Sequence, residues 1–183
     1  MPSTITIKDI SSISGYSIST VSKALNDRYE IKESTKEKIR KIARSNNYVP
    51  NNAARALRNK RTNIIAVILP KVTTTYFNTF LCEIQKKASL VNYKIIIAQS
   101  FDDFEKEKEN IVLMNDGTVD GVLILSNHQF SNYDFEIDVL RNVVVVPYEK
   151  QEVFKEDIIK MLAVSSFEEV VRLINQNFTS MYD

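Results

Sequence analysis

The stretch TIKDISSISGYSISTVSKALN, residues 6–26, has the pattern of a helix-turn-helix and sets the framework for the rest of the chain. Its first part predicts a helix over residues 7–14, because isoleucines recur at every third position and so share one apolar arc. These are Ile7, Ile10 and Ile13. Thr6 precedes them as an N-cap, and Gly15 stands where a sharp turn would end the helix.

The second part predicts a helix from Ile18 onward, capped by Ser17. At 100° per residue one side is apolar (Val21, Ala24, Leu25) and the other is small and polar with a single cation (Ser19, Ser22, Lys23, Asn26). Short hydroxyl and amide groups permit close approach to a DNA duplex, and one long cation can reach a base edge or a phosphate. This face therefore suits a DNA-recognition helix; the alternative is a surface helix of an unrelated bundle.

The charges divide sharply along the chain, although the net charge is only +1. Residues 1–61 hold 13 Lys and Arg against 5 Asp and Glu, whereas residues 62–183 hold 11 against 18. A basic head joined to an acidic body can neutralise phosphates at one end without adhering to DNA along its length.

Together with YVPNNAARAL at residues 48–57, the helix-turn-helix stretch resembles the LacI family of bacterial transcriptional regulators, and similarity to the family's core domain continues to about Asn127. The resemblance implies that the base-reading residues are Ile18, Ser19 and Lys23. Lys23 would prefer guanine edges, and Ile18 offers only apolar contact, for example to a thymine methyl. The residues implied to contact the DNA backbone are Thr6, Ser17, Thr20, Ser22 and Asn26.

A third helix is expected over residues 34–46, where Ile39, Ile42 and Ala43 form the buried stripe. Its cations are expected to give water a basic surface; they are Lys36, Lys38, Arg40, Lys41 and Arg44. Tyr48 and Val49 should close the small core. Lys32 stands where the family commonly has a small capping hydroxyl, which leaves the start of this helix open.

Residues 51–58 are rich in alanine but too short to form a stable helix alone in water. In the LacI family the corresponding segment is a hinge helix that forms on the operator, where paired leucines wedge into the minor groove and bend the DNA. The matching positions are Asn51, Ala54 and Leu57. The alternative is an ordinary alanine-rich linker.

After residue 62 the chain changes to alternating strands and helices, which predicts a doubly wound parallel α/β sheet. The expected strands cover residues 63–69, 93–98, 120–125 and 142–148. The expected helices cover residues 77–91, 104–115 (Ile111 and Met114 inward, charges 105–109 outward), 132–141, 152–163 and 167–177, the last with Ser165 and Glu168 at capping-box spacing. The predicted domains are an all-α helix-turn-helix head at 1–49, a hinge and linker at 50–62, and an α/β body at 63–183.

The resemblance implies that this body is half of a periplasmic-binding-protein-like core, with an effector held between two such halves at the carboxyl ends of strands. The candidate effector-binding residues are Tyr76, Phe77 and Asp102. However, family members continue for well over a hundred further residues that build the opposing lobe. Tyr148 and Glu149 also replace the family's usual acidic-basic pair. An intact pocket for a sugar-type effector is therefore not expected.

Enzymatic chemistry is not expected, and neither is a metal or other cofactor. Three glycines leave no phosphate-binding loop, and one histidine with one cysteine cannot build a zinc site. Cys82 is expected to be a core residue. Asp102, Asp103 and Asp120 should not converge, because Asp120 begins its strand rather than ending it. Met161, Leu162, Val164 and the stripe of Val170, Val171 and Ile174 favour core over a partner surface.

The chain is accordingly predicted to be a transcriptional regulator, most simply a repressor, that binds double-stranded DNA at a palindromic operator as a homodimer. Apolar residues at 44% and charged residues at 26% are globular values. No signal peptide or membrane span is recognisable, so a cytoplasmic location is expected. The rival from another class is a self-associating interaction protein or a remnant of a longer regulator whose head no longer functions.

Overall fold

The computed structural model describes residues 5–51, 56, 60–128, 142–149 and 155–179. The chain divides into two compact units, Met1–Arg55 and Ala56–Asp183, called here the head and the body. The predicted domain limits at residues 49 and 62 stay a prediction, because most of the segment between them lies outside the described residues.

Three helices form the head: α1 (Ile7–Ser14), α2 (Ile18–Leu25) and α3 (Glu33–Ser45). Their shared core consists of Ile10, Val21, Ala24 and Ile39, each fully buried. The periodicity of the sequence predicted all three helices to within a residue or so. Lys32 occupies the N-cap position of α3 and makes no side-chain capping bond, as its departure from the family pattern suggested.

Some side chains of the head lie elsewhere than the pattern predicted. Ile13 is 52% exposed and Val49 is 73% exposed, so neither belongs to the small core. Lys36, expected at the solvated basic surface, is only 7% exposed. Burial of this cation is tolerated because carboxylates of Asp27 and Glu33 lie against its ammonium group.

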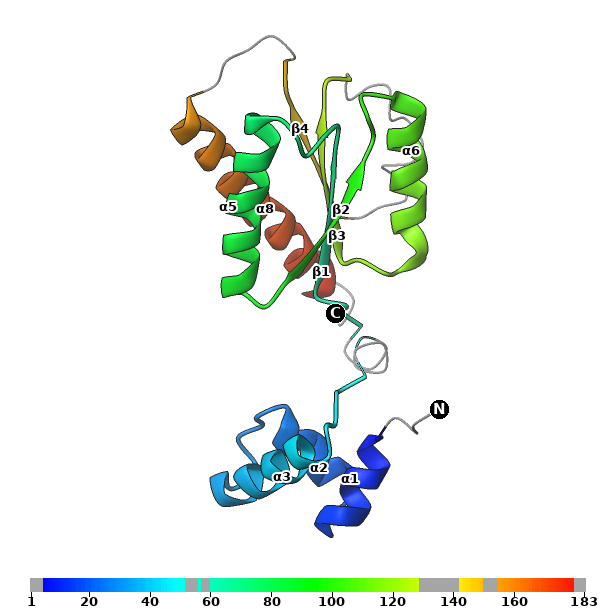
Figure 1. The fold of residues 1–183 in the computed structure, drawn as a ribbon, viewed down its shortest axis with the longest axis vertical. Coiled ribbons are helices and arrows are strands. Elements are labelled where there is room, and N and C mark those ends of the chain that lie inside the picture. Colours follow the sequence, from blue (N-terminus) through cyan, green and yellow to red (C-terminus); the bar gives the residue numbers. More distant parts are fainter. Residues whose placement is uncertain (1–4, 52–55, 57–59, 129–141, 150–154, 180–183) are drawn as a thin grey trace. The chain divides into compact units, whose positions relative to one another are not determined.

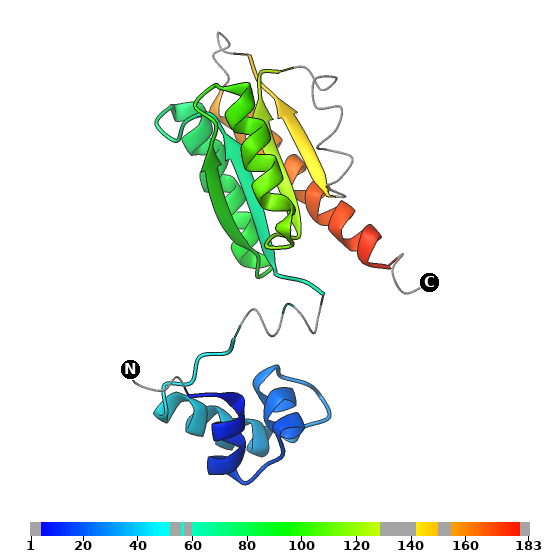
Figure 2. The same ribbon diagram turned by 90° about the vertical axis from the view of Figure 1, so that its right-hand side faces the viewer.

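A four-stranded parallel sheet forms the centre of the body (Figures 1 and 2). Its strands are β1 (Ile64–Leu69), β2 (Lys94–Gln99), β3 (Gly121–Ser126) and β4 (Val143–Pro147), in the spatial order β2-β1-β3-β4. The two central strands are almost wholly buried, which explains their continuous apolar sequences.

Helices cover both faces of this sheet, so the predicted doubly wound α/β class is confirmed for the described residues. Figure 1 shows α5 (Thr75–Leu90) and α8 (Glu156–Thr179) on one side and α6 (Phe104–Leu113) on the other. A short 3₁₀ helix, η1 (Met114–Asp116), follows α6. Alternate residues of β1 point to the two cores: Ile65, Val67 and Leu69 to the α5–α8 side, Ala66 and Ile68 to the α6 side.

The end of the chain differs from the prediction of two helices, because α8 is continuous from Glu156 to Thr179. Ser165 does not cap a new helix; its hydroxyl donates to the carbonyl of Leu162 at 3.1 Å within the same helix. The physical reason is a buried stripe at four-residue and three-residue spacing that runs through the expected break. Its members are Ile159, Ala163, Phe167, Val170 and Ile174. Val170 and Ile174 are thus core, as predicted, whereas Met161 is 73% exposed.

Two further predictions about single side chains of the body are wrong. Cys82 is exposed rather than buried, because α5 packs through Phe77, Leu81 and Ile84 and leaves Cys82 on its outer side. Glu107, expected to face water from α6, is 2% exposed. The expected helix over 132–141 lies outside the described residues. Among the described helices, none combines the length and the apolarity that crossing a membrane requires.

Candidate DNA-binding surface

The turn between α1 and α2 is fixed at both ends by hydrogen bonds. Gly15 adopts φ 74°, in the left-handed region, and its N–H donates to the carbonyl of Ser11 at 3.0 Å. The Ser11 hydroxyl in turn donates to the carbonyl of Tyr16 at 2.6 Å. These bonds hold the chain in a sharp change of direction, so α2 leaves α1 at a defined angle.

Thr6 begins α1 through a reciprocal capping box with Asp9. The Asp9 N–H donates to the Thr6 hydroxyl at 3.4 Å, and the Thr6 N–H donates to the Asp9 carboxylate at 2.8 Å. The bond from the Thr6 backbone, followed by the bond from its hydroxyl, holds the pKa of Asp9 below its ordinary value. Thr6 itself is exposed.

Helix α2 is capped by Ser17, whose hydroxyl accepts from the Thr20 N–H at 3.2 Å and lies 2.9 Å from the Thr20 hydroxyl. At the other end the Asn26 amide donates to the carbonyl of Ser22 at 2.7 Å. Ser17 is exposed, and Thr20, Ser22 and Asn26 are half-buried. The five predicted backbone-contacting residues thus sit at the ends and flanks of the two helices, several of them also forming local caps.

The predicted base-reading side of α2 is exposed and the opposite side is buried. Ile18 is 46% exposed, and the side chain of Lys23 is 47% exposed. Ser19 is exposed as well. In contrast, Val21 and Ala24 have no exposed surface. An exposed large apolar residue beside a serine and a lysine is a surface that can contact base edges.

The loop after α2 adds one residue to this surface that the sequence pattern does not indicate. Glu30 lies with a carboxylate oxygen 3.6 Å from the Lys23 ammonium. Its position has no periodic or motif signal, and only the return of the chain beside Lys23 brings it to the candidate surface. Tyr29, the residue before it, is 90% exposed.

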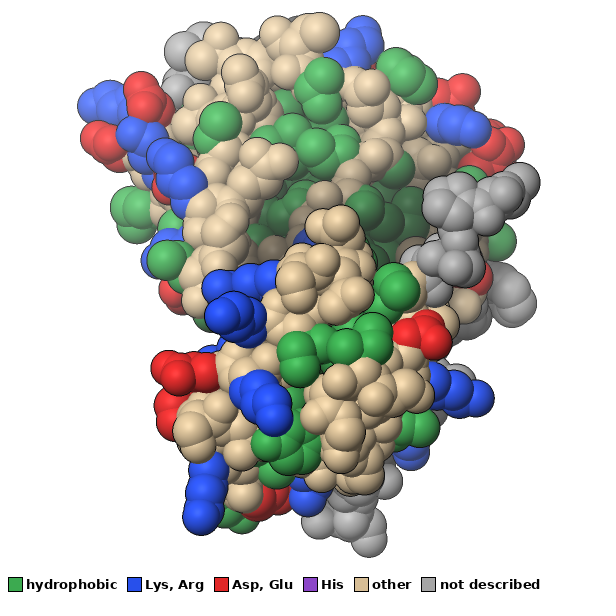
Figure 3. Space-filling view, turned by 60° about the horizontal axis from the view of Figure 1, so that its bottom comes forward, with side chains coloured by type: hydrophobic (Ala, Val, Ile, Leu, Met, Phe, Trp, Pro, Cys, Tyr) green, Lys and Arg blue, Asp and Glu red, His purple; other side chains and the backbone are tan. Residues whose placement is uncertain are grey.

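A second cluster of charges joins this loop to α3. The Asp27 carboxylate lies 2.8 Å from both Lys36 and Arg40, and Glu33 lies 3.3 Å from Lys36 and 3.2 Å from Arg40. The hydrogen bond from Lys36 is the main reason that the pKa of Asp27 is lowered, and the same bond raises the pKa of Lys36. Two of the five cations predicted to form a basic surface on α3 are therefore held by carboxylates. Figure 3 shows Lys and Arg side chains dispersed among acidic and apolar ones on the visible face.

The predicted hinge can be followed only at its start. Asn51 is exposed, whereas Ala54 and Leu57 lie outside the described residues. Beyond it, the linker is attached to the body more firmly than a solvated joint would be. The Asp120 carboxylate accepts from the Thr62 N–H at 2.7 Å and from the Asn63 N–H at 2.8 Å, and Arg61 packs over the ring of Phe178 at 4.1 Å.

The three candidate effector residues come together around Tyr148, at the carboxyl ends of the strands. The ring of Tyr148 lies 5.0 Å from Phe77 and 6.3 Å from Tyr76, and its hydroxyl donates to Asp102 at 2.7 Å. Phe77 is only 6% exposed and Tyr148 8%. Tyr148 thus fills space between these residues with its own ring. Asp120 lies at the other ends of the strands, so it does not converge with Asp102, as predicted.

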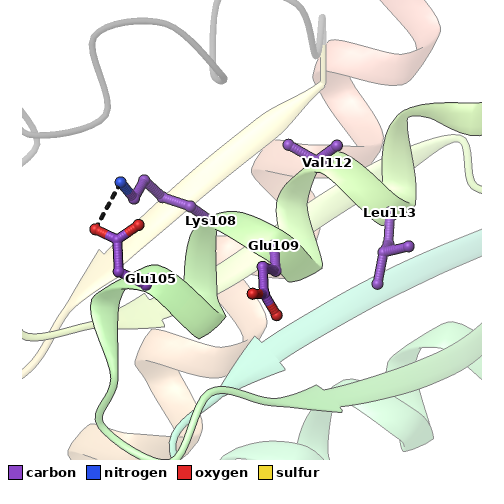
Figure 4. Close-up of a pocket in the computed structure, with 5 residues that line it drawn as sticks. All are labelled: Glu105, Lys108, Glu109, Val112 and Leu113. Carbon is purple, nitrogen blue, oxygen red and sulfur yellow. Dashed lines mark ion pairs between the residues drawn. The ribbon is translucent and has the colours of Figure 1, made fainter.

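A hollow of about 450 Å³ lies elsewhere, along the outer side of α6 (Figure 4). It is lined by Glu105, Lys108, Glu109, Val112 and Leu113, with Glu105 and Lys108 paired at 2.8 Å. None of the candidate effector residues lines it. Within the part of the chain that the structure describes, His, Cys, Asp and Glu side chains form no group of three that could hold a metal ion.

Known proteins match both units. Residues 6–51 match the family described as "Bacterial regulatory proteins, lacI family". Catabolite control protein A from Streptococcus mutans is 32% identical over 143 residues, covering 78% of this chain and 43% of that protein. The sucrose operon repressor from Pediococcus pentosaceus is 33% identical over 117 residues, covering 64% of this chain and 36% of that protein.

Among solved structures, the lac repressor dimer bound to operator and the anti-inducer ONPF has a similar fold, with a TM-score of 0.69 at 20% identity. The match covers 78% of this chain and 44% of the lac repressor chain. The chain therefore spans less than half the length of the curated relatives it matches. The family match at residues 6–51, the similarity to curated relatives over 117 to 143 residues and the shared fold agree with one another: the head of this chain belongs to the LacI family of bacterial regulatory proteins.

Proposed function

We propose that this chain is a sequence-specific DNA-binding transcriptional regulator that represses from a palindromic operator. The observation that carries the proposal is the sorting of α2, whose residues Val21 and Ala24 are completely buried while Ile18 and Lys23 stay about half exposed. A capped, firmly packed helix with an exposed reading side is what insertion into the major groove requires. The name of one relative, a sucrose operon repressor, supports the interpretation as a repressor.

Within this proposal Lys23 reads guanine, Ile18 contacts a thymine methyl, and Ser19 bonds to a neighbouring base. Thr6, Ser17, Thr20, Ser22 and Asn26 contact phosphates and fix the register of α2. Asn51, Ala54 and Leu57 belong to a hinge that orders on DNA and enters the minor groove. Phosphate contacts carry no sequence information by themselves. Substitutions of the base-reading residues and of the phosphate-contacting residues should therefore have different effects on base preference.

A homodimer is part of the proposal, because two helix-turn-helix heads related by a two-fold axis would each read one half of a palindrome. The structural relative described above is a dimer on its operator, which supports the same arrangement here. For an effector we propose no sugar-type pocket of the family kind in this chain, since Tyr148 fills the space among Tyr76, Phe77 and Asp102 and bonds to Asp102.

The rival interpretation is a self-associating interaction protein or a remnant whose head does not bind DNA. Selection of preferred duplexes from a random pool separates the two, with the mass of the complex measured alongside. The regulator should enrich a palindrome and bind it as a dimer with strong salt dependence. If no sequence is enriched, even in low salt, the chain is not a sequence-specific regulator.

Two substitutions then separate base reading from backbone positioning. Lys23→Ala should weaken binding to the selected palindrome by roughly 1–3 kcal/mol and relax the preference at one base pair per half-site. Lys41→Ala, which removes an exposed cation from α3, serves as the matched control and should keep the preference. An equal loss on palindromic and random duplexes for Lys23→Ala would exclude Lys23 as a base reader.

Thr6→Ala should weaken binding to every duplex alike, because a phosphate contact carries no base information. Thr6 also caps α1, so the substitution lowers the stability of the head as well. Thr6→Ser keeps the capping hydroxyl and should bind close to the unmodified protein. A change in base preference for Thr6→Ala would contradict the assigned role.

A further inference from the structure

An acidic residue lies on the surface that is proposed to face DNA. The Glu30 carboxylate is 3.6 Å from the ammonium of Lys23, and the two side chains are 42% and 47% exposed. An ion pair this exposed adds little to the stability of the head. A carboxylate among phosphates weakens binding to every duplex unless a donor on the DNA meets it.

The backbone holds Glu30 at this place. Before it, the Arg28 N–H donates to the carbonyl of Lys23 at 3.0 Å, which ties the loop to the last turn of α2. After it, the Ile31 N–H donates to the carbonyl of Arg28 at 3.3 Å, and the Ile31 side chain packs against the core of the head. Glu30 therefore lies in a turn anchored on both sides, next to the one cation on the reading side of α2.

The chemistry of this pair matches the major-groove edge of a G·C base pair. Guanine presents two acceptors there, O6 and N7, and cytosine presents a donor, the N4 amino group. Guanine O6 and cytosine N4 are themselves hydrogen-bonded, so they are about 2.9 Å apart. An ammonium and a carboxylate 3.6 Å apart can thus approach neighbouring donor and acceptor groups of one base pair.

An A·T pair fits this arrangement less well. In an A·T pair the major-groove donor is the adenine N6 amino group, and the acceptor bonded to it is thymine O4. Thymine O4 offers the ammonium a single acceptor atom and has a methyl group beside it. Asp27, the other acid of this loop, cannot serve in the same way, because its carboxylate is bonded to Lys36 and Arg40.

We propose that Glu30 is a specificity-determining residue that forms, with Lys23, a donor–acceptor pair reading one G·C base pair in each half-site. Lys23 donates to guanine O6 and N7, and Glu30 accepts from cytosine N4. This inference rests on the proposed DNA-binding function. It adds that Glu30 opposes binding to all other duplexes, because its charge is then left facing phosphates without a donor.

The experiment measures dissociation constants of the full chain for three kinds of duplex. The first is the selected palindrome, and the last is random DNA. Between them are variants of the palindrome that carry each of the four base pairs at the position that Lys23 reads or at one of the two flanking positions. The proteins are the unmodified chain, Lys23→Ala, Glu30→Ala, the double variant and Glu37→Ala, which removes an exposed acid from α3 as the charge control. A palindrome with N4-methylcytosine at that position blocks the free N4–H while keeping the base pair.

Glu30→Ala should bind random DNA several-fold more tightly and should lose about tenfold of the preference for G·C at the position that Lys23 reads. N4-methylcytosine should weaken the unmodified chain and leave Glu30→Ala nearly unchanged. The effects of Lys23→Ala and Glu30→Ala on the G·C preference should not add, because both act on one base pair. Glu37→Ala should change all duplexes by one common factor.

The possible failures are distinguishable. If the unmodified chain prefers no duplex over random DNA, the proposed function fails and this inference fails with it. If the chain does prefer a palindrome but Glu30→Ala shifts all duplexes equally, as Glu37→Ala does, only the inference is overturned. An undiminished G·C preference in Glu30→Ala, a preference that proves to be for A·T, or insensitivity to N4-methylcytosine would likewise overturn it.

Discussion

Replacing Gly15 by alanine should destabilise the head through backbone conformation alone. Gly15 adopts φ 74°, and a Cβ built there meets no atom within 4 Å, so no steric clash contributes. The left-handed conformation costs an L-residue about 1–2 kcal/mol. The lower entropy of the unfolded alanine chain returns roughly 0.4–1 kcal/mol. The net loss is therefore about 1 kcal/mol, which lowers the Tm of a small unit by roughly 4–8 °C.

Calorimetry of the full chain measures this, with separate transitions expected for the head and the body. Gly117 provides the matched control, since it adopts φ 82° in the body and a Cβ there also meets nothing within 4 Å. Gly15→Ala should lower only the head transition, and Gly117→Ala only the body transition. Gly15→Asn should recover much of the loss, because asparagine tolerates the left-handed region.

An unchanged head transition in Gly15→Ala would refute the reasoning, since the left-handed turn would then carry no cost. Equal losses of Tm for Gly15→Ala and Gly15→Asn would also refute the reasoning. They would indicate that any side chain at position 15 is unfavourable, whether or not the residue tolerates positive φ. DNA affinity should fall only at temperatures where the head of Gly15→Ala is partly unfolded.

Two further perturbations test the packing of each unit. Asp27→Asn keeps a residue suited to φ 57° but removes the charge that binds Lys36 and Arg40. Because folding lowers the pKa of Asp27 from 3.8, the stability that its charge gives the head is present above that pH and is lost as the pH falls through the folded-state pKa. The Tm difference between Asp27→Asn and the unmodified head should therefore vanish in acid. A Tm difference that stays constant with pH would contradict a stabilising role for the Asp27 charge. Gly121→Ala would place a Cβ 2.8 Å from Val170 Cγ2 and 3.1 Å from the Asn142 carbonyl, so it should destabilise the body by about 1–3 kcal/mol and leave the head transition unchanged. A body transition unaffected by Gly121→Ala would mean that β3 and α8 are not packed as described.

The local elements of the head were predictable from sequence because their signals are local. The capping hydroxyls of Thr6 and Ser17, and the glycine between the helices, are each within a few residues of what they terminate. The central strands β1 and β3 were predictable for the same kind of reason, since a continuous apolar run of strand length is typical of a strand buried on both faces.

The errors occurred where distant residues decide the outcome. Lys36 is buried with the carboxylates of Asp27 and Glu33 against its ammonium group. Asp27 lies outside α3, so the sequence of α3 alone does not predict this burial. The break expected near Ser165 is absent because α8 packs one continuous stripe against α5 and the sheet, which overrides a local capping pattern.

The candidate site was predictable only along α2. Its periodicity separates Val21 and Ala24 from Ile18 and Lys23, and burial in the structure follows that separation. Glu30 was missed because it reaches Lys23 through a loop. The gathering of Tyr76, Phe77 and Asp102 around Tyr148 required strand order, which periodicity does not supply.

The central claim, that the exposed side of α2 reads a DNA sequence, is tested most directly by one ratio. The dissociation constants for the selected palindrome and for a scrambled duplex of the same composition are measured with the full chain at fixed, near-physiological salt. A sequence-specific regulator should prefer the palindrome by roughly 10³-fold or more. A ratio near one would contradict the claim, because the head would then contact only the phosphate backbone.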